Sequence, residues 1–242
     1  MKLISTSFFI PPENISRGIV KFPADESAHI CKVMRAEVGD EVRAVDGEGH
    51  VLWVKLTRAD KSHARGEIIS STISEIEPHT LLTIGMPTIH PKRMESAWDS
   101  CVQLGISALI PIRTEYTQSR IKPDGKFIER LKAAGMRAML QSGRAVIPPV
   151  ESPAGLDEVV LRDFDAILFG DEEGLPTPPN SRPKLGERVL LLVGPEGGFS
   201  SEERRIIAEA GGVGISLGPR RLRAETAAIA LSIIALRWSG DI

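Results

Sequence analysis

The sequence predicts two domains of different class: a small β-barrel with one helix over residues 1–75, and an α/β domain with a mostly parallel sheet over residues 76–242. Short strands and turns dominate the first part, whereas apolar strands alternate with helices from Leu81 onward. Such alternation is typical of a parallel sheet covered on both faces. Residues 73–80, which include Pro78, are the predicted linker. A length of 242 residues is enough for two domains that each have a core.

The first domain is predicted from four short strands, a hairpin turn and a helix. The strands are expected over residues 18–22, 41–45, 51–57 and 64–70. The sequence DGEG at residues 46–49 is typical of a hairpin turn. Ser27 precedes a segment in which Ile30, Val33 and Met34 recur at helical spacing. We therefore expect a helix that presents these three side chains to the core.

The second domain is predicted from five apolar strands and four helices. The strands are expected over residues 81–86, 108–112, 166–169, 189–193 and 213–217. The first helix follows the first strand, with Met94, Trp98, Cys101, Val102 and Gly105 at core-facing spacing. The second is expected over residues 126–141, and the last over 224–238. Ser200 and Glu203 form a capping-box pattern that begins the third helix.

Composition excludes several classes of protein. No apolar run approaches the roughly 18 residues that a membrane span requires, and Pro11 and Pro12 interrupt the apolar patch at the N-terminus. The two cysteines are 70 residues apart and the five histidines are scattered, so we expect neither a disulfide nor a metal, and a cytoplasmic location. Residues 91–150 carry ten Lys and Arg against five Asp and Glu, a local net charge of +5. This basic segment is either a phosphate-binding surface or a solvated helix face.

The sequence GPEGG at residues 194–198 follows an apolar strand and precedes a capped helix. Glycines there permit positive φ and let the backbone approach a ligand closely. The sequence is neither a dinucleotide fingerprint nor a P-loop, and a carboxylate inside it is a poor neighbour for a pyrophosphate. A cation or ribose hydroxyls suit that carboxylate better, which favours S-adenosylmethionine as the ligand. The alternative is a strand-to-helix turn that binds nothing.

The sequence LGPRRLR at residues 217–223 places three arginines within four positions before a helix of small residues. Guanidinium groups suit phosphate or an electron-rich base edge. The alternative is that these arginines bind no ligand and only keep the end of the helix soluble. The helix that follows is apolar almost all round, which predicts a buried helix and suits a subunit interface.

These two loops carry a family resemblance. LLVGPEGGFS at 191–200 with LGPRRLRAETAA at 217–228 resembles the bacterial small-subunit ribosomal RNA uridine methyltransferases that form 3-methyluridine, which belong to the SPOUT class. The segments HICKVMRAEVGDEVRAVDGEG, RMESAWDSCVQLGISALIPIRTE and QSGRAVIPPV also fit this family, so the resemblance covers most of the chain. It implies a PUA-like RNA-binding barrel and an α/β domain with a deep trefoil knot over about residues 166–230. Such threading is otherwise rare.

The resemblance also implies a homodimer, S-adenosylmethionine as cofactor, and 16S ribosomal RNA or the small subunit as partner. Segments 192–198 and 217–222 would surround the adenine and ribose, with the loop at 170–173 at the edge. The expected cofactor-binding residues are Leu192, Val193, Gly194, Glu196, Gly197, Gly198, Leu217, Gly218, Leu222 and Thr226.

Catalytic and RNA-binding roles follow from the chemistry of uracil N3, which must lose a proton before it accepts a methyl group. We expect Arg223 to support the uracil or the loop, and Glu225 or Glu115 to accept the proton. The expected RNA-binding residues are Arg35, Arg144, Arg220 and Arg221. Four positions depart from the usual family pattern: Ser100, Gln103, Tyr116 and Leu140.

Three alternative functions stay open. One is a SPOUT enzyme with another RNA target, which the N-terminal barrel and the GPEGG loop disfavour. A second is a catalytically weak RNA-binding homologue, which the departures on the presumed RNA side keep open. A nicotinamide-dependent oxidoreductase ranks last, because the glycine fingerprint and its acidic ribose reader are absent.

Overall fold

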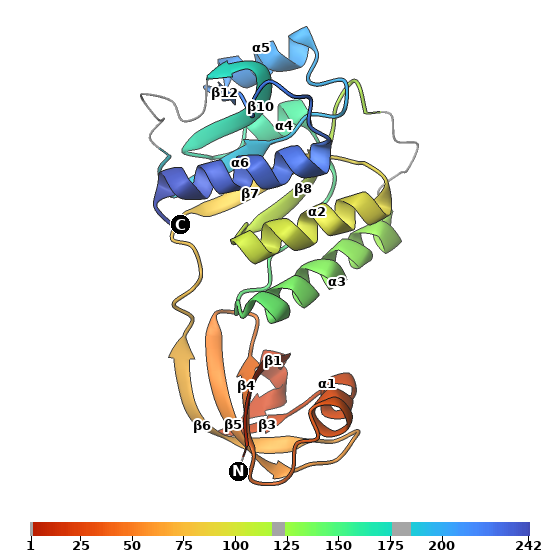
Figure 1. Ribbon diagram of the computed structural model, residues 1–242, viewed down its shortest axis with the longest axis vertical. Helices are drawn as coiled ribbons and strands as arrows, with labels where there is room; N and C mark the ends of the chain where they lie inside the picture. Colours follow the sequence, from red (N-terminus) through yellow and green to blue (C-terminus); the bar gives the residue numbers. More distant parts are fainter. Residues whose placement is uncertain (1, 118–123, 176–184) are drawn as a thin grey trace. The chain divides into compact units, whose positions relative to one another are not determined.

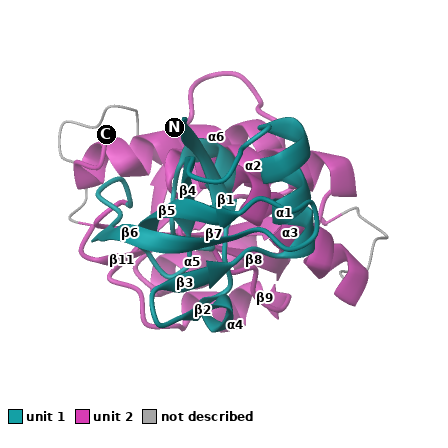
Figure 2. Cartoon of the chain, turned by 90° about the horizontal axis from the view of Figure 1, so that it is seen from below, with its two compact units in different colours: residues 1–77, 139–147 teal, residues 78–138, 148–242 magenta. Residues whose placement is uncertain are grey.

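The structure is a computed structural model that describes residues 2–117, 124–175 and 185–242. The chain divides into two compact units, which Figure 2 shows in different colours. The first unit comprises residues 1–77 and 139–147, and the second comprises residues 78–138 and 148–242. The sequence does not anticipate that residues 139–147 group with the N-terminal strands. The expected knot includes residues 176–184, which lie outside the described residues, and it stays a prediction.

The first unit is built on a six-stranded sheet with the order β1-β4-β5-β6-β3-β2. Strand β1 is parallel to β4, and the other neighbours are antiparallel. Its core contains Phe8, Ile30, Val42, Val54 and Leu56, each at most 1% exposed. The strands are β1 (Leu3–Phe9), β2 (Ile15–Ser16), β3 (Ile19–Lys21), β4 (Glu41–Val45), β5 (His50–Arg58) and β6 (Arg65–Ile73). The predicted hairpin joins β4 to β5, whereas β1 and β2 were not predicted.

The predicted helix of the first unit is present, but its geometry differs from the prediction. Helix α1 (Ala24–Ala28) passes directly into a π-helical turn, η2 (His29–Val33), where Met34 N donates to His29 O at 3.0 Å. A π-turn is wider than an α-turn, so side chains three residues apart no longer share a face. Ile30 is fully buried as expected, whereas Val33 is 66% exposed. The expectation that Val33 faces the core is therefore wrong.

A carboxylate of the first unit holds residues 144–147 in place. Glu77 accepts hydrogen bonds from Arg144 Nε at 2.9 Å and from Ala145 N at 2.7 Å. Arg144 Nη2 lies 2.8 Å from the same carboxylate, and the Arg144 residue is only 4% exposed. Ile147 N donates to Gly47 O at 2.9 Å, which fixes the segment to the hairpin turn.

Replacing Glu77 with glutamine is expected to lower the free energy of unfolding of the first unit by about 2 kcal/mol, because a buried guanidinium loses its charged acceptor. The amide oxygen of the introduced side chain still accepts from Ala145 N, so the backbone contact remains. Urea unfolding monitored by circular dichroism measures the change. Glu75→Gln is the matched control, since Glu75 is exposed in the same segment, and it should shift stability by less than about 0.5 kcal/mol. Equal stability of the two variants would contradict the prediction.

The second unit has a six-stranded sheet with the order β12-β10-β11-β7-β8-β9, and all its neighbouring strands are parallel. The predicted α/β class with a parallel sheet is therefore confirmed. The strands are β7 (Leu81–Pro87), β8 (Ala108–Arg113), β9 (Ala154–Gly155), β10 (Ala166–Leu175), β11 (Arg188–Leu192) and β12 (Val213–Ile215). The short strand β9 and the helix α4 (Leu156–Val160) were not predicted.

Helices cover both faces of this sheet, because alternate side chains of the central strands are apolar on each face. Ile112, Phe169 and Leu192 lie in one cluster with residues of α4 and α5 (Ser201–Glu209). The helices α2 (Pro91–Leu104) and α6 (Ala224–Ser239) contact each other, and α6 also contacts β7 and β10 (Figure 1). The remaining helix is α3 (Gly125–Ser142). Parallel strands end at the same edge, so the segments that follow β10, β11 and β12 come together there.

Candidate functional site

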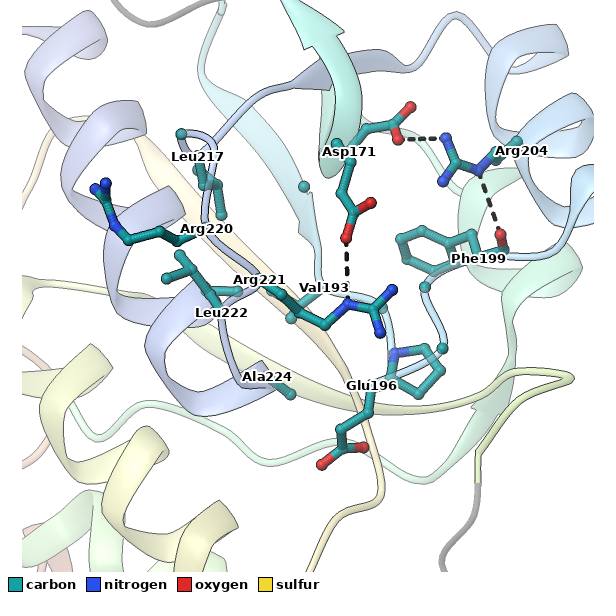
Figure 3. A pocket seen from close by; sticks show the side chains of 18 residues that line it. Asp171, Val193, Glu196, Phe199, Arg204, Leu217, Arg220, Arg221, Leu222 and Ala224 are labelled. Atoms are coloured by element: carbon teal, nitrogen blue, oxygen red, sulfur yellow. Dashed lines mark hydrogen bonds and ion pairs between the residues drawn. The ribbon is translucent and has the colours of Figure 1, made fainter.

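A pocket lies where these three segments meet, and Figure 3 shows it from close by. About 760 Å³ of space lies inside the pocket and its open mouth, part of which is open solvent. One wall follows β11, the second is the end of β10, and the third is the loop between β12 and α6. The lining residues are Gly170, Asp171, Glu172, Val193, Gly194, Pro195, Glu196, Gly197, Gly198, Phe199, Arg204, Leu217, Gly218, Arg220, Arg221, Leu222, Ala224 and Ala227.

The GPEGG loop owes its shape to what precedes and follows it. Strand β11 is buried from Val189 to Leu192, which fixes the start of the loop in the sheet. Gly198 has φ +71, a conformation that side chains disfavour, and its N–H donates to Pro195 O at 2.8 Å. Phe199 then packs edge-on against Phe169, with ring centroids 6.0 Å apart. The loop is thus held by backbone turns and by one buried ring.

The capping box at the start of α5 is present as predicted. Ser200 Oγ accepts from Glu203 N at 3.3 Å, and Glu203 Oε2 accepts from Ser200 N at 2.9 Å. The other oxygen, Glu203 Oε1, accepts from Glu115 N at 2.8 Å. This carboxylate therefore joins the helix start to the loop after β8 as well as capping the helix.

Two ion pairs join residues that line the pocket. Arg204 pairs with Asp171, and Arg204 Nε also donates to Phe199 O at 3.3 Å. Arg221 Nε lies 3.4 Å from Glu172 Oε1 across the mouth, and both of these side chains are more than 70% exposed. Both pairs are drawn in Figure 3. The Asp171 side chain is 11% exposed, so the first pair is part of the wall, whereas the second lies in solvent and contributes little stability.

Arg93 in the first turn of α2 connects two of the pocket loops. Its Nη1 donates to Glu196 Oε1 at 3.1 Å, while Nε and Nη2 bind Glu225 at 2.9 and 2.5 Å. The hydrogen bonds to Glu225 raise the pKa of Arg93, and the same contact lowers the pKa of Glu225 below its ordinary value. The guanidinium therefore holds the GPEGG loop and the start of α6 together.

The structure bears on two expectations about these carboxylates. Glu196 was expected to face a cationic ligand; it is among the residues that line the pocket, and its carboxylate accepts from Arg93 Nη1. Glu225 was expected to accept a proton, but a carboxylate with a lowered pKa in a two-bond ion pair is a poor base. Glu115, which was also expected to accept the proton, is exposed, and its backbone N–H donates to Glu203 at the start of α5.

Most of the expected cofactor-binding residues lie around the pocket. Within the described part of the chain, Leu192 and Thr226 are the two that do not line it: Leu192 is fully buried in β11, and Thr226 is exposed on α6. The eight that line it are Val193, Gly194, Glu196, Gly197, Gly198, Leu217, Gly218 and Leu222. Arg220 and Arg221, expected to bind RNA, also line it.

The other expected residues are not among those that line the pocket. Arg223 stands between the lining residues Leu222 and Ala224. Arg35 belongs to the first unit and has φ +53, an uncommon conformation for a residue with a side chain. Arg144 is buried against Glu77, which disfavours the expected contact with a phosphate.

Sequence reasoning missed Phe199, Arg204 and Arg93. Phe199 directly follows the GPEGG loop and Arg204 lies in the helix after it, so their position after a strand end was an available signal. Arg93 lies about 100 residues earlier in the chain, and its role depends on how α2 packs against α6. Two of the family departures, Ser100 and Gln103, make hydrogen bonds within α2 to Ser96 and Asp99.

Metal-binding clusters and membrane-spanning helices are both absent from the part of the chain that the structure describes. Across residues 2–117, 124–175 and 185–242, no group of three or more His, Cys, Asp or Glu could hold a metal ion. No helix among these same residues is long and apolar enough to cross a membrane.

Comparisons with known proteins agree with the geometry. The family model of the RNA methyltransferase domain matches residues 77–236, and that of the RNA methyltransferase PUA domain matches residues 22–69. Ribosomal RNA small subunit methyltransferase E of Aquifex aeolicus is 27% identical over 209 residues, which are 86% of this chain and 90% of that protein. The same-named protein of Bacillus subtilis is 29% identical over 228 residues, 87% of each chain.

Solved structures give the same result. A crystal structure of ribosomal RNA small subunit methyltransferase E from Neisseria gonorrhoeae bound to S-adenosyl methionine has a TM-score of 0.84 and 27% identity, covering 97% of this chain and 98% of that one. A probable rRNA-methyltransferase from Porphyromonas gingivalis has a TM-score of 0.85 with the same identity and coverage. The PUA-like and SPOUT fold classes expected from the sequence are confirmed. Since the RNA methyltransferase domain model spans residues 77–236, well over half of the chain, the protein belongs to this RNA methyltransferase family.

Proposed function

We propose that the protein transfers a methyl group from S-adenosylmethionine to N3 of a uridine in 16S ribosomal RNA of the small subunit. The observation that carries this proposal is the pocket at the ends of β10, β11 and β12, lined by eight of the residues expected to hold the cofactor. The Neisseria gonorrhoeae relative, with a TM-score of 0.84, is bound to S-adenosyl methionine. Small-subunit ribosomal RNA is the substrate class in the names of the curated relatives.

The residues present fit this cofactor. Glycines at 194, 197 and 198 leave room for a ligand against the backbone, and Leu217 and Leu222 supply apolar surface for an adenine. Asp171 and Glu172 supply acceptors at the edge for hydroxyl or amino groups. When bound, S-adenosylmethionine supplies an electrophilic methyl group on a positively charged sulfur. The residues that line the pocket would hold that group in place.

The chain's own contribution to the chemistry is positioning and charge. Uracil N3 would lose its proton to solvent and form a bond to the methyl carbon as the methyl–sulfur bond breaks, and the neutral thioether S-adenosylhomocysteine would be the leaving group. The ring gains negative charge as N3 is deprotonated, and a guanidinium aimed at a carbonyl oxygen stabilises that charge. Arg223 is the candidate, because it stands beside the lining residues Leu222 and Ala224. N3 is on the pairing edge of the base, so the uridine must be unpaired or flipped out.

Three further parts of this proposal concern the assembly. The PUA-like unit, which contains Arg35, would bind RNA, and the second unit would contain the knot over about residues 166–230. Helix α6 would pair with a second copy. The helix is mostly apolar, and its Ile233 side chain is 42% exposed. A solution mass of one chain by light scattering would contradict the homodimer.

Primer extension across 16S ribosomal RNA, from strains with and without the gene, tests the function. Methylation at N3 blocks base pairing, so reverse transcriptase should stop at one uridine only when the gene is present. Complementation with the intact gene should restore the stop, and complementation with Arg223→Ala should not. A stop in another RNA would favour a different target. Calorimetry that detects no heat with S-adenosylmethionine would favour an RNA-binding homologue without activity.

A further inference from the structure

The loop after β8 places an aromatic ring directly on the GPEGG loop. The backbone of Gly197 is in contact with Tyr116: a methyl group on its α-carbon would lie 3.2 Å from Tyr116 Cβ and 3.3 Å from Cδ2. Gly197 lines the pocket, whereas Tyr116 stands outside the described lining and is 44% exposed. Tyr116 thus packs against the GPEGG loop and keeps part of its surface in solvent.

This position is fixed by hydrogen bonds and does not depend on the ring. Glu115 N donates to Glu203 Oε1 at 2.8 Å, which holds the tyrosine's neighbour at the start of α5. Thr117 N donates to Thr114 O at 3.2 Å, and the hydroxyl groups of these two threonines lie 2.6 Å apart. A substitution at Tyr116 therefore leaves every one of these bonds in place.

We propose that Tyr116 stacks on an unpaired base of the substrate RNA next to the target nucleotide and so positions the strand at the pocket mouth. An exposed aromatic ring on a fixed backbone is the usual platform for unpaired bases, and it loses little conformational freedom on binding. The cofactor is the less suitable partner, because Tyr116 is not among the residues that line the pocket. The inference rests on the proposed RNA substrate and adds a substrate-contacting residue to the site.

Fluorescence anisotropy with two labelled oligomers tests the stacking without any methyl transfer. One is a 12-mer of uridines, and the other is a 12-mer of abasic ribose phosphates with the same charge. Tyr116→Ala should weaken binding of the uridine oligomer about 10-fold and leave binding of the abasic oligomer unchanged. Tyr116→Phe should stay within twofold of the wild type on both. Leu161→Ala is the matched control, since Leu161 is an 82% exposed apolar side chain of the same unit.

The other outcomes overturn the proposal. Equal weakening of both oligomers would show that Tyr116 acts on the sugar-phosphate chain of the RNA and not on its bases. A wild type that binds both oligomers equally would show that bases are not recognised. Calorimetry with S-adenosylmethionine should give the same Kd for Tyr116→Ala and the wild type; a weaker Kd would place the ring on the cofactor. In the methylation assay the variant should raise KM for RNA more than it lowers kcat. A wild type without methyl transfer would reject the proposed function while the oligomer result still decides the role of Tyr116.

Discussion

Replacing Arg223 with alanine is expected to lower kcat for methyl transfer by about 100-fold, because one donor to a developing oxyanion contributes that much or more in other enzymes. The Kd for S-adenosylmethionine should stay within a few-fold, since Arg223 lies outside the described pocket lining. The charge of the guanidinium matters most once N3 has lost its proton. The variant should therefore have a lower kcat, whereas its KM for the cofactor should change little.

The structure makes this a clean substitution. Arg223 is the N-cap residue of α6, but within the described chain its side chain makes no capping hydrogen bond. The helix start depends on the backbone, where Ala227 N donates to Arg223 O at 2.9 Å, and that bond survives in the alanine variant. Folding should be unaffected, and circular dichroism checks this.

Two controls separate charge at this position from charge in general. Arg237→Ala removes an exposed arginine from the last turn of the same helix and should leave kcat within twofold. Arg223→Lys keeps the positive charge without the planar guanidinium, and its kcat should lie between those of Arg223→Ala and the wild type. Measured turnover for Arg223→Ala equal to that of Arg237→Ala would exclude the proposed role.

The fold of the second unit was predictable because its signal is local. Strands buried on both faces are apolar throughout, and the helices between them carry capping residues such as Ser200 and Glu203. The short elements β9 and α4 were missed, because two and five residues are too few to show a period. In the first unit, the π-turn at residues 29–33 shifted Val33 outward, and nothing in the residue pattern distinguishes a π-turn from an α-turn.

The candidate site was predictable as far as it depends on the backbone of single loops. Glycines at a strand end mark where a ligand can approach, and the pocket lies there. Charge pairing across the fold was not predictable. The sequence predicts that Arg144 binds RNA, whereas in the structure it is buried against Glu77. It likewise predicts that Glu196 contacts the ligand, and in the structure Glu196 pairs with Arg93. Each pairing partner lies between 67 and 103 positions away in the chain.

The Arg93 bridge leads to the second large expected effect. Arg93→Glu would bring three carboxylates together, where the structure has one guanidinium between Glu196 and Glu225. Like charges placed against each other in an interface cost several kcal/mol, so the GPEGG loop and the start of α6 should separate. Both elements line the pocket, and we expect Kd for S-adenosylmethionine to rise by about 100-fold, which corresponds to about 2.7 kcal/mol.

Charge exchange tests whether the bridge acts through its ion pairs. The double variant Arg93→Glu with Glu225→Arg restores an opposite-charge pair between α2 and α6, and it should bind the cofactor within about 10-fold of the wild type. Lys92→Glu is the control, because it makes the same charge change at the neighbouring position of the same helix turn. Calorimetry gives Kd for the wild type, for Arg93→Glu and Glu225→Arg alone, and for the double variant, and the non-additivity of these four values gives the coupling between the two sites. If the double variant binds no better than Arg93→Glu alone, Arg93 acts by packing rather than by charge, and the bridge does not set the loop spacing. If Lys92→Glu weakens cofactor binding as much as Arg93→Glu, the added negative charge acts through the overall electrostatic potential at the pocket and not through the ion pairs of Arg93.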